Sequence, residues 1–453
     1  MSDTAPAASS APAPAGARFL EERRVELILF GFSLFAYALS SWGMLWHQSQ
    51  APHFVWQAQA FDHGQLSLLG QPPNLNDWVL RDGRWYVSFP PFPAVLMMPL
   101  VAIWGTSLND VAFTLVFAAL NVALLYRLLR RFAESGEEGA GAEGGSGPAS
   151  APAAAPRAPW DHAWLALLFG FGTLAWSCGI RGEVWFTAQT LGVTLTLGYL
   201  LASLRAGHPA LAGLLLGCAA ITRTPLLFSG IFFLLEALLT PADGGLPDRA
   251  TWPALRGALS RTVRDPAQRR MALGRLLKFS GPFLLVMLPM AWANTARFGS
   301  PGEFGHSFLY ANRVNADIEQ YGLFHYHYLE RNLHAALTRL PSIQFHPLRL
   351  GFDGHGMSLL VTTPLFLLLL WPARRPRLTR ALWLTVAVLA LPGLLYQNDG
   401  WLQFGFRFSL DYTPYLFALL SLGARPMDGR FWALGWAGVL VNGWGAAVFN
   451  RLY

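Results

Sequence analysis

Apolar segments follow one another along most of this chain, and they leave little choice of fold. A backbone inside a lipid bilayer must satisfy its own hydrogen bonds, which a helix of about 20 apolar residues does. Charged residues make up only 13% of the chain, about half their usual share in soluble proteins. The sequence therefore predicts an all-α polytopic membrane protein with about 11 transmembrane helices, and several segments are short enough to change that count by one or two. The segments are Val25–Trp46, Asn109–Leu129, Ala163–Gly179, Val184–Leu204, Pro209–Ile221, Pro225–Leu239, Phe279–Ala296, Met357–Leu370, Ala381–Tyr396, Tyr412–Leu422 and Phe431–Phe449.

The net charge of +7 comes almost entirely from arginines in the connectors, with Lys278 as the single lysine. A cytoplasmic N-terminus places about two thirds of the basic residues on the cytoplasmic side, as the positive-inside rule requires. We therefore expect a multi-pass protein of the inner (plasma) membrane whose first large connector, His47–Leu108, faces outward. A charge spread in this way does not indicate nucleic-acid binding.

Two stretches are too poor in apolar side chains to build a core: Met1–Ala17 and Ala133–Pro159. We expect both to be disordered, the second as a cytoplasmic loop that interrupts a single domain over 18–453. The basic stretch Arg249–Arg275 suits either a cationic helix on the inner leaflet or a solvated loop. Cys178 and Cys218 lie in or beside the apolar segments and imply no disulfide framework.

The outward connectors are rich in acids, arginines and aromatic residues. In the first, the apolar run Phe92–Trp104 is too short to span, so we expect a helix lying in the interface and started by Pro90 and Pro91. A second outer segment, Arg297–Gly356, contains a helical apolar pattern near Leu333. A third runs from Gln397 to Tyr412.

Arginine near membrane depth is costly unless it is paired or faces a polar cavity, and its planar group grips phosphate well. We therefore expect an outward-facing site for a lipid-linked phosphate, with a carboxylate as general base. The alternative, that these arginines and acids only pair with one another and hold loops together, stays open. The candidates are Asp62, Asp77, Asp82, Arg181, Glu183, Arg223, Arg407 and Asp411.

Other kinds of site find less support. Histidines crowd the second outer segment, but no metal-binding spacing such as H-E-x-x-H occurs, so surface histidines are the favoured interpretation. No Gly-rich phosphate loop is present, and no cofactor is implied. The first apolar segment lacks an A-x-A site at its end and is expected to be retained rather than cleaved.

Three motifs, in this order, resemble those of integral-membrane glycosyltransferases of the GT-C superfamily. They are FPPFPAVLMMPLVAIWG (Phe89–Gly105), ITRTP (Ile221–Pro225) and GFRFSLDYTP (Gly405–Pro414). The similarity is to bacterial family-39-like, protein-mannosyltransferase and aminoarabinose-transferase relatives, and it runs from Val25 to about Leu422. The resemblance implies a large outer loop with two juxtamembrane helices, and a sugar donor linked to polyprenyl phosphate.

The chain departs from that family at one important place. The family has an acid, the presumed base, soon after the first span, whereas this chain has APHFVWQAQAF there, with His53 as the nearest polar residue. Either His53 is the base, or a later acid is, or transfer activity has been lost. Among the acids Asp77 is preferred, because Asp82 lies in an Asp-Gly turn with its own structural reason and Asp62 follows a helix.

The leading hypothesis is thus an inverting glycosyltransferase that acts at the outer face of the inner membrane. Asp77 or His53 would be the base, Arg223, Arg407 and Arg181 would bind the donor phosphate, and Glu183 and Asp82 would assist binding. The acceptor would be a glycan, a lipid or a protein, and membrane lipids would surround the chain. Two alternatives stay open: a transporter or flippase of a phosphate-bearing lipid, and a non-catalytic membrane scaffold.

Overall fold

Helices dominate the structure, a computed structural model that describes residues 15–74, 76–134, 157–241, 252–309, 312–345, 348–374 and 378–449. The α-helices are α1 (Ala15–Ser40), α2 (Trp42–Leu45), α3 (His53–Asp62), α4 (Phe92–Trp104), α5 (Asp110–Glu134), α6 (Pro159–Phe171), α7 (Ala175–Gly179), α8 (Val184–Ser203), α9 (Pro209–Ala220), α10 (Gly230–Leu239), α11 (Trp252–Arg264), α12 (Pro266–Phe298), α13 (Asn312–Tyr321), α14 (Leu329–Leu333), α15 (Leu359–Thr362), α16 (Thr379–Leu395), α17 (Thr413–Leu422) and α18 (Gly429–Val448). Shorter 3-10 and π segments are η1 (Gly105–Ser107), η2 (Leu204–Ala206), η3 (Thr224–Ser229), η4 (His306–Phe308), η5 (Tyr326–Tyr328), η6 (His334–Thr338), η7 (Pro364–Leu370) and η8 (Arg407–Asp411).

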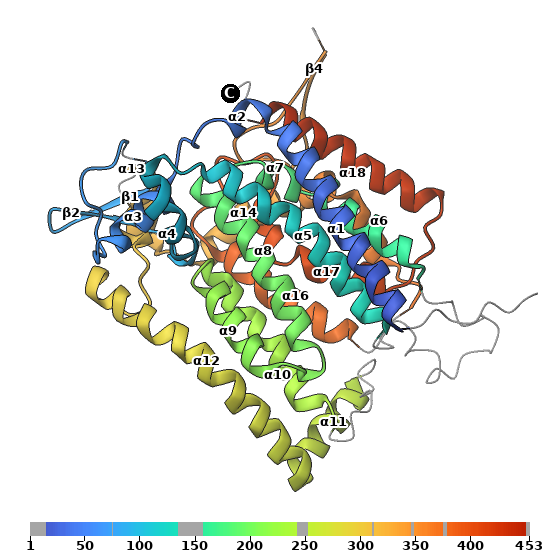
Figure 1. Ribbon diagram of the computed structural model, residues 1–453. Helices are drawn as coiled ribbons and strands as arrows, with labels where there is room; N and C mark the ends of the chain where they lie inside the picture. Colours follow the sequence, from blue (N-terminus) through green and yellow to red (C-terminus); the bar gives the residue numbers. More distant parts are fainter. Residues whose placement is uncertain are drawn as a thin grey trace, which may run out of the picture.

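Two antiparallel hairpins complete the described chain. One pairs β1 (Trp78–Arg81) with β2 (Arg84–Val87), so that Trp78 faces Val87. The other pairs β3 (Ser342–Phe345) with β4 (Leu348–Gly351) and projects from the body of the molecule (Figure 1).

All eleven predicted segments contain helix, which confirms the all-helical class. Among the described residues, four helices are long and apolar enough to cross a membrane: α5, α8, α12 and α18. The predicted number of spans stays a prediction, because other segments are shorter or interrupted. Pro225 and Pro364 each lie in the first turn of a 3-10 segment, where a residue without an N–H is tolerated and a continuous α-helix is not required.

The edge helix α12 has a strongly apolar, exposed surface that suits lipid. Leu285 and Trp292 are 72% and 68% exposed, as expected for side chains that face acyl chains rather than water. α12 packs mainly against α9, and the two run side by side (Figure 1). Gly213 and Gly217 of α9 form a small-x-x-x-small pattern that lies directly against Phe279 and Val286 of α12.

One end of the bundle carries α3, α4 and the β1–β2 hairpin, whereas α11 lies at the other end (Figure 1). The helix predicted over Phe92–Trp104 is confirmed with the same bounds as α4, and its place in the membrane interface stays a prediction. Pro91 is its N-cap and Gly105 follows its last residue. Phe54 and Val55 of α3 pack with Met97 of α4 in one apolar cluster. Ile103, in contrast, is 70% exposed, so this helix pair has an inward face and an outward apolar face.

Other expectations are met in part. The basic stretch holds α11, and Asp265 then caps the start of α12 through a bond from the Ala267 amide. The helical pattern near Leu333 forms a broken succession of η5, α14 and η6 rather than one helix. α1 begins at Ala15, inside the predicted tail, and the rest of that tail lies outside the described residues. The same holds for most of the predicted cytoplasmic loop, which α5 enters as far as Glu134.

Candidate functional site

Asp77 lies in the loop between α3 and β1 and is held in an uncommon backbone conformation, with φ of +58°. Aspartate tolerates this left-handed region better than most residues. Its Oδ2 atom accepts a hydrogen bond from the indole Nε1 of Trp185 at 3.0 Å. Burial raises the pKa of Asp77, while the Trp185 bond and the nearby Arg407 charge act to lower it. The carboxylate is therefore positioned by α8 and has an environment that makes it a stronger base.

Arg407, the first residue of η8, lies close to that carboxylate. Its side chain is buried, with 5% of the residue exposed, and its Cζ atom lies 5.3 Å from the ring centroid of Phe186 and 6.0 Å from that of Trp185. Nε and Nη1 have no hydrogen-bond partner among the described residues. Burial lowers the pKa of Arg407 to about 10, so the group remains a cation at neutral pH. A buried cation with unused donors can bind an anion.

Arg223, the residue directly before η3, reaches the same region from the turn between α9 and η3. Its Nε and Nη2 atoms donate to the two carboxylate oxygens of Asp411 at 2.6 and 2.8 Å. Arg223 is close enough to Arg407 to lower its pKa. The Asp411 carboxylate thus pairs with Arg223, whereas two nitrogens of Arg407 have no hydrogen-bond partner among the described residues.

Arg181 and Glu183 form a closed pair beside this region. Arg181 donates through Nε and Nη2 to the two Glu183 oxygens at 3.1 and 2.5 Å, and through Nη1 to the Phe449 carbonyl at 3.3 Å. Its guanidinium lies between the rings of Phe186 and Phe449. Each Arg181 nitrogen thus has at least one partner within the fold, so this guanidinium is already held by Glu183 and the chain near Phe449.

His53 is the first residue of α3 and is fully buried. Its ring stacks on Trp78 at 3.8 Å, and Nε2 lies 2.9 Å from the carbonyl oxygen of Asn76. Burial lowers the pKa of His53 to about 4, so the ring is neutral near pH 7. These contacts connect the start of α3 to the loop that carries Asp77.

Asp82 and Asp62 lie apart from the Asp77–Arg407 pair. Asp82 occupies the tip of the β1–β2 hairpin with φ of +50°; its side chain is 89% exposed and lies 3.6 Å from Arg81. Asp62 ends α3 and is also exposed. The turn chemistry of Asp82–Gly83 accounts for its position without a ligand.

Sequence reasoning missed a second acid–histidine pair. Asp399 is buried, and its Oδ2 lies 2.5 Å from Nδ1 of His355. Gln403 links this pair to the site, because its Nε2 donates to the carbonyls of both residues and its Oε1 accepts from the Arg407 amide. Nothing in the sequence places His355 opposite Asp399. Trp185 was missed as well, since a tryptophan at the membrane interface is unremarkable by itself.

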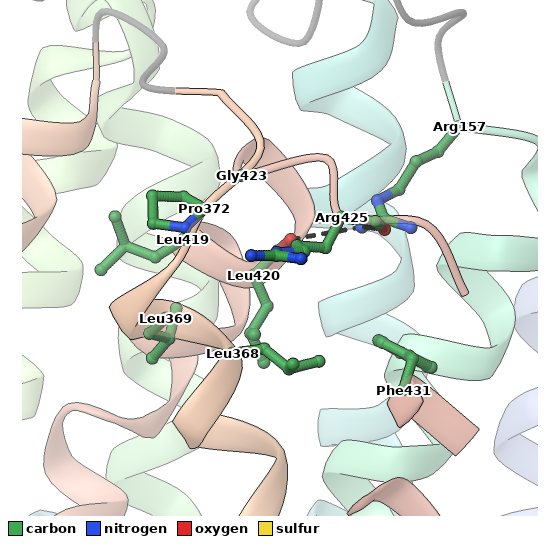
Figure 2. Close-up of a pocket in the computed structure, with 9 residues that line it drawn as sticks. All are labelled: Arg157, Leu368, Leu369, Pro372, Leu419, Leu420, Gly423, Arg425 and Phe431. Carbon is green, nitrogen blue, oxygen red and sulfur yellow. Dashed lines mark hydrogen bonds between the residues drawn. The ribbon is translucent and has the colours of Figure 1, made fainter. Parts of the chain in front are cut away.

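The described residues contain no group of three or more His, Cys, Asp or Glu side chains arranged to hold a metal ion. A small pocket of about 10 Å³ lies beside the end of α17, at the opposite end of that helix from Asp411. Figure 2 shows Arg157 reaching across to the chain near Arg425, where its Nη2 donates to the Arg425 carbonyl at 2.8 Å. Arg157 also bonds the carbonyls of Leu420 and Ser421. It therefore caps the C-terminal end of α17, as cations do at helix ends.

No protein family matches this sequence, and no curated protein matches it. Among solved structures, the chain is similar to the oligosaccharyltransferase of Archaeoglobus fulgidus in its apo form, with a TM-score of 0.45 and 14% identity over 94% of this chain and 56% of that one. It is also similar to ArnT from Cupriavidus metallidurans bound to undecaprenyl phosphate, with a TM-score of 0.43 and 13% identity over 95% of this chain and 64% of that one. The archaeal oligosaccharyltransferase AglB, in complex with an inhibitory peptide and a dolichol phosphate, gives a TM-score of 0.44 and 13% identity over 95% and 56%. This chain thus spans less than two thirds of each, and TM-scores at this level do not establish a shared activity.

Proposed function

We propose that this chain is an inverting membrane glycosyltransferase that uses a polyprenyl-phosphate sugar donor at the outer face of the inner membrane. One observation carries the proposal: the Asp77 carboxylate lies beside Arg407, a buried cation whose Nε and Nη1 have no partner among the described residues. A base next to an anion-binding group is what transfer from a lipid phosphate needs.

In the proposed reaction Asp77 accepts the proton of an acceptor hydroxyl. The acceptor oxygen attacks the anomeric carbon from the face opposite the donor phosphate, a carbon–oxygen bond forms, and the bond to the phosphate oxygen breaks with its electron pair. The configuration at that carbon inverts. Arg407 donates to the departing phosphate, whose charge increases as the bond breaks, and Arg223 adds positive charge nearby.

The remaining candidates support the site in other ways. His53 holds the Asp77 loop through Trp78 and Asn76 and is a poorer base, because its ring is inaccessible and its pKa is low. The Arg181–Glu183 pair fixes the start of α8, whose second residue is Trp185. Asp82 marks the outer hairpin rather than the reacting groups. The acceptor would be a glycan, a lipid or a protein that reaches the outer surface between these loops.

Separate Asp77→Asn and His53→Ala variants, assayed for sugar transfer from polyprenyl-phosphate donors, test the assignment. We expect Asp77→Asn to lose at least about 100-fold in rate, the usual contribution of a general base, and His53→Ala to keep more activity per folded molecule. Asp82→Asn is the matched control and should transfer normally. Full activity in both Asp77→Asn and His53→Ala would remove the base assignment. Lipid movement between leaflets without transfer in the wild type would instead support a flippase.

A further inference from the structure

An open cleft of about 780 Å³ lies at the outer end of α12, separate from the Asp77–Arg407 pair. Residues 64–71, which follow α3, form one wall. Residues 83–86 of the β1–β2 hairpin form another, and Ala296 and Arg297 of α12 form the third. None of the groups used in the proposed reaction lines this cleft.

Arg297 gives the cleft a cation with unused hydrogen-bond donors. Only 4% of the residue is exposed, and its Nη2 donates to Oδ1 of Asn294 at 2.7 Å. Nε and Nη1 have no partner among the described residues. Leaving guanidinium donors buried and unpaired is costly, and an oxyanion that presents two oxygens would satisfy them.

The rim and walls favour the same kind of ligand. Arg84, which also lines the cleft, is exposed and has no ion-pair partner in the described parts of the chain. No carboxylate is among the described residues that line the cleft. Amide and hydroxyl side chains suited to ligand hydroxyl groups come from Gln65, Ser67 and Gln71, and an indole ring comes from Trp85.

We propose that this cleft binds an oxyanion, phosphate or carboxylate, carried on a hydroxyl-bearing molecule. The role of this cleft rests on the proposed function. The β1–β2 hairpin, which forms one wall, begins directly after Asp77, so the cleft would hold the charged part of the acceptor while Arg407 holds the donor. The binding itself does not depend on that role.

Calorimetric titration of the purified full chain tests the binding, with glucose 6-phosphate, inorganic phosphate and uncharged glucose as probes. We expect glucose 6-phosphate to bind more tightly than phosphate, and glucose to bind most weakly. Arg297→Gln should weaken glucose 6-phosphate binding at least about tenfold, since bonds from a charged donor are lost. Arg84→Gln, at an exposed rim position, should weaken it less and does not threaten folding.

A second pair of variants tests the location. Ala296 is exposed and lines the cleft, so Ala296→Trp should fill the cleft and remove binding. The neighbouring Thr295 is exposed but is not among the residues that line the cleft, so Thr295→Trp is the matched control. Equal binding by the wild type and Ala296→Trp would overturn the proposal, as would no binding of either anion.

Nanodiscs identify the source of the oxyanion. If phosphatidylglycerol nanodiscs suppress glucose 6-phosphate binding and phosphatidylcholine nanodiscs do not, a lipid headgroup occupies the cleft; equal binding in both supports a non-lipid ligand. The Asp77→Asn variant separates the two proposals, because it should bind glucose 6-phosphate like the wild type while losing transfer. The wild type could also bind the anion, lose that binding in Ala296→Trp, and yet show no transfer activity. That combination would support the cleft assignment and refute the proposed function.

Discussion

Trp185 touches both charged groups of the candidate site, and its contact with Asp77 is the more specific. Its indole N–H donates to Oδ2 of Asp77 at 3.0 Å, while the guanidinium of Arg407 lies 6.0 Å from the same ring. Trp185, in the first turn of α8, thus lies against both the proposed base and the arginine proposed to bind the phosphate. It also opposes the effect of burial, because a hydrogen bond to the carboxylate favours its charged form.

Trp185→Phe should therefore move the acid limb of the pH–rate profile to higher pH. The base acts when unprotonated, so the rate falls as the pH drops through the Asp77 pKa, which burial already raises from its ordinary value. Without the indole N–H the pKa rises further and the fall begins at higher pH. The position of the acid limb is measured from single-turnover transfer rates between about pH 4 and 9, a range that covers ordinary and raised carboxyl pKa values. Trp383→Phe, at an exposed position in α16, is the control and should leave the acid limb where it is in the wild type. An unshifted acid limb in Trp185→Phe would contradict the proposed role of the Trp185–Asp77 hydrogen bond.

Arg407→Gln should reduce the transfer rate by about 100-fold or more, the usual cost of removing a group that stabilises transition-state charge. Arg407→Lys should recover part of the rate, because it keeps the charge but lacks the planar fork. Steady-state kinetics with varied donor separate an effect on donor binding from one on turnover. Arg256→Gln, on an exposed face of α11, controls for the loss of one positive charge. Wild-type kinetics in Arg407→Gln would exclude this residue from the site.

The sequence was most informative where one local rule decides the structure. Pro91 and Gly105 delimit α4, and an apolar run of that length was predicted to lie in the interface. Asp77 could be preferred to Asp82 because an Asp-Gly turn already explains the latter. Pairings between distant segments could not be predicted. The sequence offers Arg181, Arg223 and Arg407 as candidates, and only the structure shows that the first two already pair with a carboxylate, whereas two nitrogens of Arg407 have no partner among the described residues.

Arg181 and Glu183 provide a test of that distinction. Removing one member of a buried pair leaves an uncompensated charge, so Arg181→Met should destabilise the protein by about 3–5 kcal/mol. The double variant Arg181→Met/Glu183→Gln should recover much of that loss, since neither charge remains. Thermal unfolding in detergent measures the stability, and transfer is normalised to the folded fraction. A large loss of donor affinity in the folded double variant would show that Arg181 binds substrate after all.

His53 predicts a pH dependence of stability. Its pKa is about 4 in the folded chain and near 6.5 when unfolded, so the unfolded state binds more protons between these values. Stability should therefore fall as the pH drops from about 6.5 to about 4, by an amount on the order of a few kcal/mol. His53→Phe keeps a ring against Trp78 and should show a shallower fall. The comparison is thermal unfolding of both proteins at several pH values, and equal slopes would contradict the assignment.

The α9–α12 contact gives the sharpest prediction about packing. A Cβ atom at Gly213 would lie 2.0 Å from the Phe279 carbonyl oxygen, which belongs to the backbone and cannot move unless the helices separate. Gly213→Ala should therefore destabilise the protein by about 1–3 kcal/mol, the usual cost of overpacking. At Gly281, on α12 itself, a Cβ meets nothing within 4 Å, so Gly281→Ala should be neutral or stabilising by up to about 1 kcal/mol through helix propensity. Both are measured as unfolding midpoints in the same detergent. Arg297, near the C-terminal end of α12, lines the cleft proposed to bind an oxyanion, so a displaced helix should also weaken anion binding there. Gly213→Ala and Gly281→Ala should therefore differ in both measurements. Equal stability of the two variants would mean that close approach at Gly213 does not hold α12 in place.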